Sequence, residues 1–230
     1  MRSQRRLVSP QSSTIILPSL YDGLIAGFHL DEISGNPIDF VGSLAPTLNT
    51  VTQGVTGKFG KCVSIDIGYV GLNTNSLLGG LSSFTFACWQ KDNLNQTRNN
   101  LAGSYGGSRM YAFAQNSFNQ WLGYIYVGTA IQGGSFNPPA GVNWIDYTRW
   151  YLVIFEWTGT EFRCYVDNQQ SINFHSTPAG TIQKGTTETI GGSWRDGDSY
   201  KNIDEALYWN RPLTADEKTN LWNEGNGIIL

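Results

Sequence analysis

The strongest constraint on the fold is one short helix signal that follows an apolar segment near the C-terminus. Residues 203–209 form an apolar run typical of a strand, and Pro212 ends it because proline has no backbone N–H to donate. Thr214 and Glu217 have the spacing of a capping box, in which each side chain accepts from the backbone N–H of the other residue. Gly225 suits the left-handed position after the helix. Since the rest of the chain has almost no other helical pattern, we predict a β-sandwich closed by this helix.

Alternation of apolar and polar residues predicts the strands of this sandwich. The clearest case is the segment 84–89, where Phe84, Phe86 and Cys88 share one face and predict a strand that is buried on one side. Further strands are predicted at residues 24–30, 62–72, 110–113, 121–127, 150–157, 162–166 and 187–191.

Two details of this pattern are specific enough to be tested. Val63, Ile65 and Ile67 are predicted to share the buried face of one strand, and residues 133–142 are predicted to form a Gly/Pro-rich loop. The composition agrees, because 27 Gly and only 14% charged residues suit short strands separated by turns. A chain of 230 residues without a linker predicts one domain.

Four motifs in a fixed order carry a resemblance to a known family. They are GLIAGFHLDE (23–32), GKFGKC (57–62), FTFACW (84–89) and IDEALYWNRPLT (203–214). This ordered set resembles laminin-G-like domains of the concanavalin A-like lectin/glucanase superfamily. The resemblance implies an all-β, two-sheet antiparallel jelly-roll sandwich over residues 21–230, with one short C-terminal helix. Residues 1–20 are then an extended basic arm.

This N-terminal arm has no acidic residue and no apolar periodicity, so burial of its own side chains cannot fold it. Two interpretations stay open. It is either a frayed terminus or a docking arm that orders when residues 14–17 add as a strand to a partner's sheet edge. The candidate docking residues are Arg2, Arg5, Arg6, Ile15, Ile16 and Leu17.

The resemblance also implies a structural calcium site. In related domains the loop after the first strand, together with the Asp of the Ile-Asp-Glu motif, sometimes holds this ion through oxygen ligands at about 2.3–2.6 Å. The candidate ligands are Asp31, Asp39 and Asp204, with Glu32 as a further donor. The alternative is that Asp31 and Asp204 accept from backbone N–H groups at strand ends. No other cofactor is expected.

The sequence does not favour an enzyme. Glucanases of this superfamily place an acid and a nucleophile at alternate strand positions, about 5 Å apart. Here Glu156 stands alone in its segment, while Asp204 and Glu205 are adjacent and are predicted to point to opposite faces. Only two histidines are present, His29 and His175, and neither lies in a zinc-binding pattern.

A glycan-binding module fits better, because sugars dock their apolar faces on aromatic rings while polar side chains bind the hydroxyls. Two candidate loops have this mixture of residues. The first contains Trp194, Arg195, Asp196, Asp198 and Tyr200; the second contains Tyr105 and Arg109, with Trp121, Trp144 and Tyr147 nearby in sequence. The alternative is that these aromatic residues pack in the core, an interpretation that applies least to Trp194.

Charge, hydropathy and cysteine content limit the possible binding partners and the cellular compartment of the protein. The net charge of −3 gives no general attraction for nucleic acid. The sequence contains no run of about 18 apolar residues, so membrane insertion is not expected. Cys62, Cys88 and Cys164 lie in strand-like segments and are predicted to be buried apolar residues, which favours a reducing compartment. The first residues are not followed by a long apolar core, so no secretory signal is expected.

The ending LWNEGNG (221–227) resembles laminin-G-like domains of phage virion proteins. It implies a non-enzymatic structural or decoration protein of a capsid or tail, located in the virion and assembled in the host cytoplasm. The expected partners are other virion proteins, bound through the arm, and cell-surface glycans. Homo-oligomerisation stays open. The alternatives are a cellular carbohydrate-binding or adhesive protein and a glycan hydrolase of the same superfamily.

Overall fold

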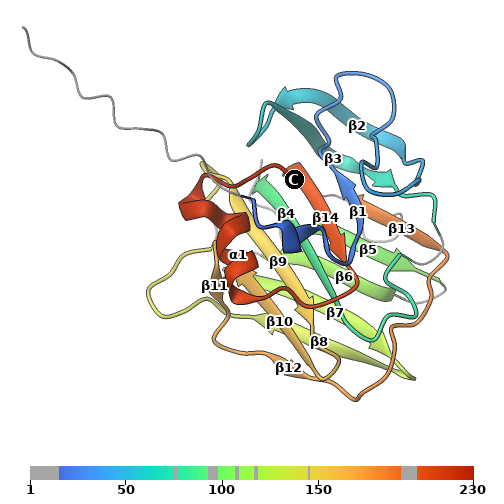
Figure 1. Cartoon of the computed structure of the whole chain (residues 1–230), viewed down its shortest axis with the longest axis vertical. Helices are drawn as coiled ribbons and strands as arrows, with labels where there is room; N and C mark the ends of the chain where they lie inside the picture. The colour runs from blue at the N-terminus through green and yellow to red at the C-terminus, as the bar shows by residue number, and fades with distance from the viewer. Residues whose placement is uncertain are drawn as a thin grey trace, which may run out of the picture.

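The protein is an antiparallel β-sandwich with one helix packed on its outer face (Figure 1). The computed structural model describes residues 16–74, 77–92, 98–106, 109–116, 119–144, 146–192 and 201–230. The elements in chain order are η1 (Pro18–Tyr21), β1 (Leu24–Phe28), β2 (Thr47–Thr56), β3 (Lys61–Gly71), β4 (Phe84–Asp92), β5 (Arg98–Tyr105), β6 (Arg109–Asn116), β7 (Gln120–Val127), β8 (Ala130–Phe136), β9 (Tyr151–Trp157), β10 (Glu161–Val166), β11 (Gln169–Gln170), β12 (His175–Ser176), β13 (Thr187–Gly191), β14 (Lys201–Trp209), α1 (Ala215–Trp222) and η2 (Asn223–Gly225).

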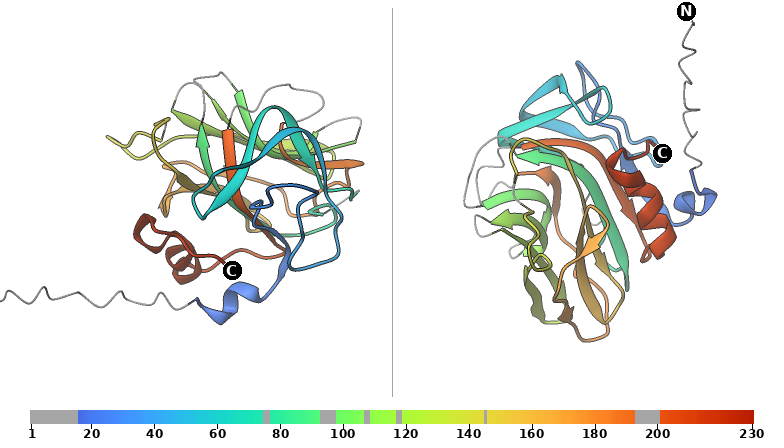
Figure 2. Two further views of the ribbon diagram at one scale, coloured as in Figure 1. Left: turned by 90° about the horizontal axis from the view of Figure 1, so that it is seen from above. Right: turned by 90° about the vertical axis from the view of Figure 1, so that its left-hand side faces the viewer.

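One curled sheet supplies both layers of the sandwich. Its strand order is β11-β10-β9-β4-β14-β3-β13-β5-β6-β7-β8, and β1, β2 and β12 pair with β14, β3 and β10. The curl brings β6 opposite β9, as the 4.6 Å distance between the ring centroids of Phe113 and Phe155 shows. Figure 2 shows the two layers, with α1 outside them. The predicted all-β antiparallel sandwich is therefore confirmed.

The main core lies between the two layers and is rich in aromatic residues. Phe84, Phe86 and Cys88 point into it from β4, as their spacing predicts. Phe113 stacks on Phe86 and Phe155, and these two contacts join β6 to β4 and β9, which are far apart in sequence. The three cysteines are buried and free, and burial raises the pKa of Cys62 and Cys88 to about 12, so these thiols stay protonated.

A second apolar cluster covers the opposite face of β4, β9 and β14. Ala87 and Trp89 on β4 pack there with Leu221 of α1. Trp209 joins the same cluster, and its indole N–H donates to the backbone carbonyl of Leu20 at 2.7 Å. The prediction that β4 is buried on one side is therefore wrong, because α1 and η1 cover its outer face.

The capping box at the start of α1 is confirmed. Glu217 N donates to Thr214 Oγ1 at 3.2 Å, and Thr214 N donates to Glu217 Oε2 at 2.8 Å. The left-handed residues after the helix begin at Asn223 (φ 44°), two residues before Gly225 (φ 86°). Within the described residues, no helix is long and apolar enough to cross a membrane.

Two local predictions are wrong for identifiable reasons. Ile67 is 63% exposed because the pairing of β3 with β2 shifts between Asn49 and Val51, which breaks the two-residue alternation. The predicted loop at 133–142 contains the second half of β8. Gly133 (φ 117°) belongs to this strand, and a Cβ there would lie 2.1 Å from the carbonyl oxygen of Gly123.

Candidate ligand-binding site

A pocket of about 400 Å³ opens beside the C-terminal end of α1, and we call it the tryptophan pocket. Four separate segments form it: the turn between β2 and β3, strand β4, the ends of the β9–β10 hairpin, and the end of α1. It is lined by Lys58, Trp89, Arg149, Trp150, Asp167, Trp222 and Gly225.

The aromatic walls come from residues at the ends of elements. Trp150 directly precedes β9, and Trp222 is the last residue of α1; both are half-buried against the second apolar cluster. Trp89 is only 3% exposed, and the ring of Phe59 meets it edge-on at 6.1 Å. Gly227 (φ 74°) lies so close that a Cβ there would be 2.8 Å from the Trp89 ring. The rings are therefore held in place by packing within the domain.

Lys58 brings a positive charge to this apolar wall. Its Nζ donates to the carbonyl oxygen of Gly225 at 2.5 Å and lies 4.3 Å from the centre of the Trp89 ring. Burial lowers the pKa of Lys58, and the carboxylates of Asp167 and Asp204 act in the opposite direction. A cation over an indole face is itself favourable, so the ammonium stays beside the ring.

Arg149 and Asp167 form the polar side of the pocket. The guanidinium of Arg149 is paired with the Asp167 carboxylate and lies 3.8 Å from the centre of the Tyr151 ring. The other Asp167 oxygen accepts from Leu152 N at 3.0 Å. Asp167 itself is left-handed (φ 50°), in the turn between β10 and β11. The pocket thus combines fixed aromatic faces with fixed donors and acceptors, an arrangement suited to binding.

The sequence did not reveal this pocket. Trp222 entered the sequence analysis only within the motif 221–227, and Trp150 only as the start of a predicted strand. Lys58 lies about 90 residues from Arg149 and Trp150 in the sequence. The available signal was the position of two tryptophans at the ends of elements, Trp150 before β9 and Trp222 at the end of α1.

The sequence-predicted glycan loops lie partly outside the described residues. Trp194, Arg195, Asp196, Asp198 and Tyr200 lie outside the described residues. Arg109 begins β6 opposite Tyr105, but its side chain is likewise outside the description. Tyr105 is 1% exposed, and Trp121 and Trp144 are also buried. These three aromatic side chains are therefore placed inside the domain and not on its surface.

The carboxylates expected to hold calcium do not converge. Asp39 accepts from backbone N–H groups of its own loop and of Gly27 at 3.1 Å, while Asp204 accepts from Phe59 N at 2.9 Å. Asp31 is exposed. Within the described ranges no group of three His, Cys, Asp or Glu residues could hold a metal ion. The described residues therefore do not fit the expected calcium site, and Asp39 and Asp204 instead satisfy backbone donors.

Asp204 and Glu205 bind different neighbours. Glu205 (φ 53°) sits where the pairing of β14 with β4 shifts, and its carboxylate lies 2.9 Å from Nδ1 of His29. The imidazole of His29 stacks on Phe40 at 4.3 Å. The hydrogen bond to Glu205 raises the pKa of His29, although burial opposes it. This arrangement gives the adjacent carboxylates separate structural roles.

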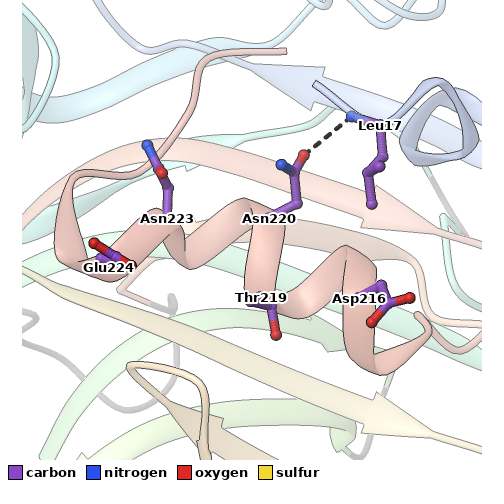
Figure 3. Close-up of a pocket in the computed structure, with 6 residues that line it drawn as sticks. All are labelled: Leu17, Asp216, Thr219, Asn220, Asn223 and Glu224. Carbon is purple, nitrogen blue, oxygen red and sulfur yellow. Dashed lines mark hydrogen bonds between the residues drawn. The ribbon is translucent and has the colours of Figure 1, made fainter. Parts of the chain in front are cut away.

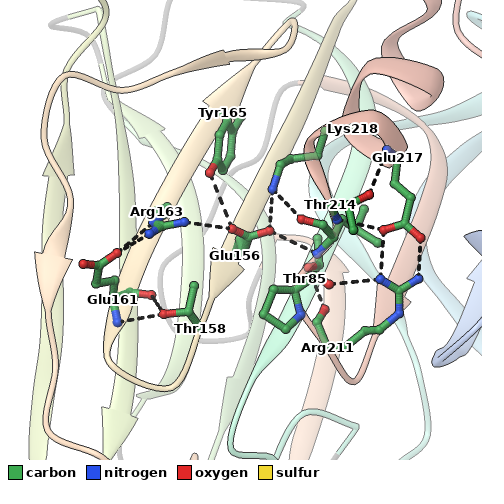
Figure 4. A network of polar contacts seen from close by, with 12 residues as sticks. Thr85, Glu156, Thr158, Glu161, Arg163, Tyr165, Arg211, Thr214, Glu217 and Lys218 are labelled. Atoms are coloured by element: carbon green, nitrogen blue, oxygen red, sulfur yellow. Dashed lines mark hydrogen bonds and ion pairs between the residues drawn. The ribbon is translucent and has the colours of Figure 1, made fainter.

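Glu156 is the centre of a buried polar network between β9, β10 and α1 (Figure 4). Its carboxylate accepts from Lys218 Nζ at 2.7 Å and from Leu213 N at 3.1 Å. Tyr165 and Arg163 approach the other oxygen at 3.5 and 3.7 Å. The network borders a second pocket of about 540 Å³, which we call the Glu156 pocket. Glu156 thus anchors the start of α1 to the sheet.

The described end of the N-terminal arm contacts the domain itself. Ile16 and Leu17 pack against the second apolar cluster. Leu17 N donates to Asn220 Oδ1 of α1 at 3.1 Å, beside a pocket of about 440 Å³ that is lined mostly by polar side chains (Figure 3). The other predicted docking residues, Arg2, Arg5, Arg6 and Ile15, lie outside the described residues.

Comparison with known proteins agrees with this fold. The family model described as the concanavalin A-like lectin/glucanases superfamily, Laminin_G_3, matches residues 67–217. The chain therefore belongs to this superfamily. A search of the curated proteins found no match.

Several solved structures share the fold at low sequence identity. The binding domain of Paraclostridial Mosquitocidal Protein 1 is 14% identical with a TM-score of 0.70, over 90% of this chain and 53% of that one. The binding domain of botulinum neurotoxin DC, in complex with rat synaptotagmin II, is 14% identical with a TM-score of 0.69, over 90% and 52%. Trypanosoma rangeli sialidase in complex with sialic acid is 15% identical with a TM-score of 0.65, over 89% and 34%. The chain thus spans about half or one third of these proteins, and the likeness is one of fold.

Proposed function

We propose that this domain is a non-catalytic glycan-binding module and that its ligand occupies the tryptophan pocket. The observation that carries the proposal is the meeting of two half-buried indoles, Trp150 and Trp222, with the charged groups of Lys58, Arg149 and Asp167. A sugar has an apolar ring face and a rim of hydroxyl groups. Aromatic faces and fixed polar groups match both parts of this ligand.

The fold relatives are consistent with this role. A solved structure on the cell entry of botulinum neurotoxin type C, which depends on interaction with two ganglioside molecules, is 14% identical with a TM-score of 0.68. Another is the T. rangeli sialidase with bound sialic acid. Both are carbohydrate-directed proteins, so the superfamily supports a glycan as the class of ligand.

A glycan array followed by calorimetry tests the site. Trp222→Ala removes one stacking face, and we expect affinity for the array-positive glycan to fall about tenfold or more, the equivalent of about 1.4 kcal/mol. Phe174→Ala is the matched control, because Phe174 is a 48% exposed aromatic residue outside the pocket. Thermal unfolding of both variants identifies any loss that arises from misfolding. Equal affinities of Trp222→Ala and wild type would contradict the assignment of the pocket.

The non-catalytic part of the proposal rests on the carboxylates. Glu156 is bound to Lys218 and Leu213 N, and Arg163 stands between Glu156 and Glu161. This arrangement differs from an acid and a nucleophile that share an open cleft. Incubation with the array-positive polysaccharide should release no reducing ends. Their release would instead support the hydrolase alternative.

We further propose that the domain is carried on a phage virion, where residues of the arm dock on another particle protein in the host cytoplasm. The support is the resemblance of residues 221–227 to virion proteins and the three arginines Arg2, Arg5 and Arg6. Mass spectrometry of purified particles should detect the wild-type chain, and alanine replacement of these arginines should reduce its copy number. Absence of the chain from particles, with glycan binding intact, would favour a cellular adhesive protein.

A further inference from the structure

We propose that the tryptophan pocket and the Glu156 pocket are neighbouring subsites of one groove, and that the ligand is a linear oligosaccharide with sugar units in both. This inference rests on the proposed function and specifies its class of ligand. Each pocket offers polar groups beside a ring: Trp150 and Trp222 in the first, Tyr165 in the second.

The sheet side of the groove is continuous through one turn. Asp167 lines the tryptophan pocket, and the next residue, Asn168, lines the Glu156 pocket. Consecutive Cα atoms are about 3.8 Å apart, so the two pockets meet at this turn. Both residues are left-handed, with φ 50° and 62°, which fixes the turn between β10 and β11.

The helix side runs in the same direction. Trp222 lines the tryptophan pocket, while Lys218 and Thr219 line the Glu156 pocket. Residues three and four apart lie on one helix face, about one turn or 5.4 Å along the axis. On both walls, the residues that line one pocket are therefore followed within a short distance by residues that line the other. This is expected for a single groove with α1 on one side and the β10–β11 turn on the other.

The boundary between the pockets is polar and exposed. Asn168 Nδ2 donates to Thr219 Oγ1 at 3.0 Å across the groove. An amide has two N–H donors and a carbonyl oxygen. Asn168 can therefore still bind a hydroxyl group of an oligosaccharide that runs over this contact. A polar crossing favours a hydroxyl-rich chain over an apolar one.

The Glu156 pocket supplies groups of both signs. Lys218 and Glu156 form an ion pair at 2.7 Å, Arg163 lies beside Glu156 at 3.7 Å, and Gln170 is exposed at the edge. Because Glu156 and Lys218 are buried and bonded to each other, the hydrogen bonds to hydroxyl groups come from the half-buried guanidinium of Arg163 and the exposed amide of Gln170. The second subsite therefore adds hydrogen bonds to the stacking of the first.

The test is the dependence of affinity on oligosaccharide length. The probes are chito- and malto-oligosaccharides of one to six units and sialyllactose, measured by calorimetry. Ala215 is an exposed residue of α1 that lines the Glu156 pocket, so Ala215→Trp fills this subsite without touching the core. Asp216→Trp is the matched control, because the neighbouring Asp216 is exposed and lines a different pocket.

We expect wild-type affinity to rise about tenfold or more between one-unit and longer probes. Ala215→Trp should abolish this gain and leave binding of the shortest probe unchanged, while Asp216→Trp should keep the gain. Length-independent binding that Trp222→Ala weakens would overturn the groove but preserve the proposed function. Binding of long probes by Ala215→Trp at wild-type affinity would also overturn the groove. Failure of every probe to bind would count against the proposed function and this inference together.

Discussion

At the scale of single residues, the half-buried His29 after the first strand and the buried Asp204 within the last strand make stability depend on pH. Burial raises the pKa of Asp204 from 3.8 to about 7, and the bond to Glu205 raises that of His29. Both groups bind protons more readily in the folded than in the unfolded chain. By linkage, stability therefore falls as pH rises through these pKa values, and it is greatest below them.

We predict that the midpoint of thermal unfolding falls between pH 5 and pH 8. Asp204→Asn should reduce this fall, because asparagine keeps an oxygen acceptor for Phe59 N and does not ionise. A change of about 1 kcal/mol corresponds to about 2–4 °C for a chain of this size. Asp66→Asn, at an exposed position, is the control and should leave the pH profile unchanged. Identical profiles for Asp204→Asn and wild type would rule out Asp204 as a cause of the pH dependence of stability.

At the scale of elements, one buried ion pair fastens α1 to the sheet. Lys218→Met leaves the Glu156 carboxylate buried without its ammonium partner, and we expect a loss of about 3–5 kcal/mol in urea unfolding. The double variant Glu156→Gln/Lys218→Met should recover most of this loss, since glutamine still accepts from Leu213 N. Lys184→Met, at an exposed position, is the neutral control. A double variant no more stable than Lys218→Met would show that the charge imbalance is not the cause.

Local sequence predicts where a helix or strand begins and ends better than it predicts which other elements pack against it. Thr214 and Glu217 form their capping box because the interaction is contained within one turn. Ile67 is exposed because a shift in pairing depends on the neighbouring strand, which alternation alone does not encode. The outer face of β4 is buried because α1, far along the chain, covers it. The propensities and periodicity of the β4 residues carry no information about whether a distant helix packs on this face.

At the scale of the whole molecule, the fold was predictable and the candidate site was not. Ordered motifs along the chain sufficed for a sandwich, since most of its strands show their own pattern. Strands β2 and β5 were not predicted, and half of β8 was expected to be a loop. The tryptophan pocket instead needs Lys58, Arg149 and Trp222 to meet from separate segments. Their meeting is a property of the strand order, in which β4 lies between β9 and β14. The sequence alone predicts most of the strands but leaves their order in the sheet open.

That strand order also predicts how the molecule unfolds. The main core and the second apolar cluster lie on opposite faces of the same strands, as Phe86 and Ala87 show, so neither can separate without disrupting β4. Leu221→Ala, which opens a cavity under α1, should lower stability by about 2–5 kcal/mol. Tryptophan fluorescence and far-UV circular dichroism should still report one coincident transition. Ile229→Ala, at a half-exposed position, should change stability by less than about 0.5 kcal/mol. An early fluorescence change that precedes loss of the strand signal would instead show that α1 and its cluster unfold as a separate unit.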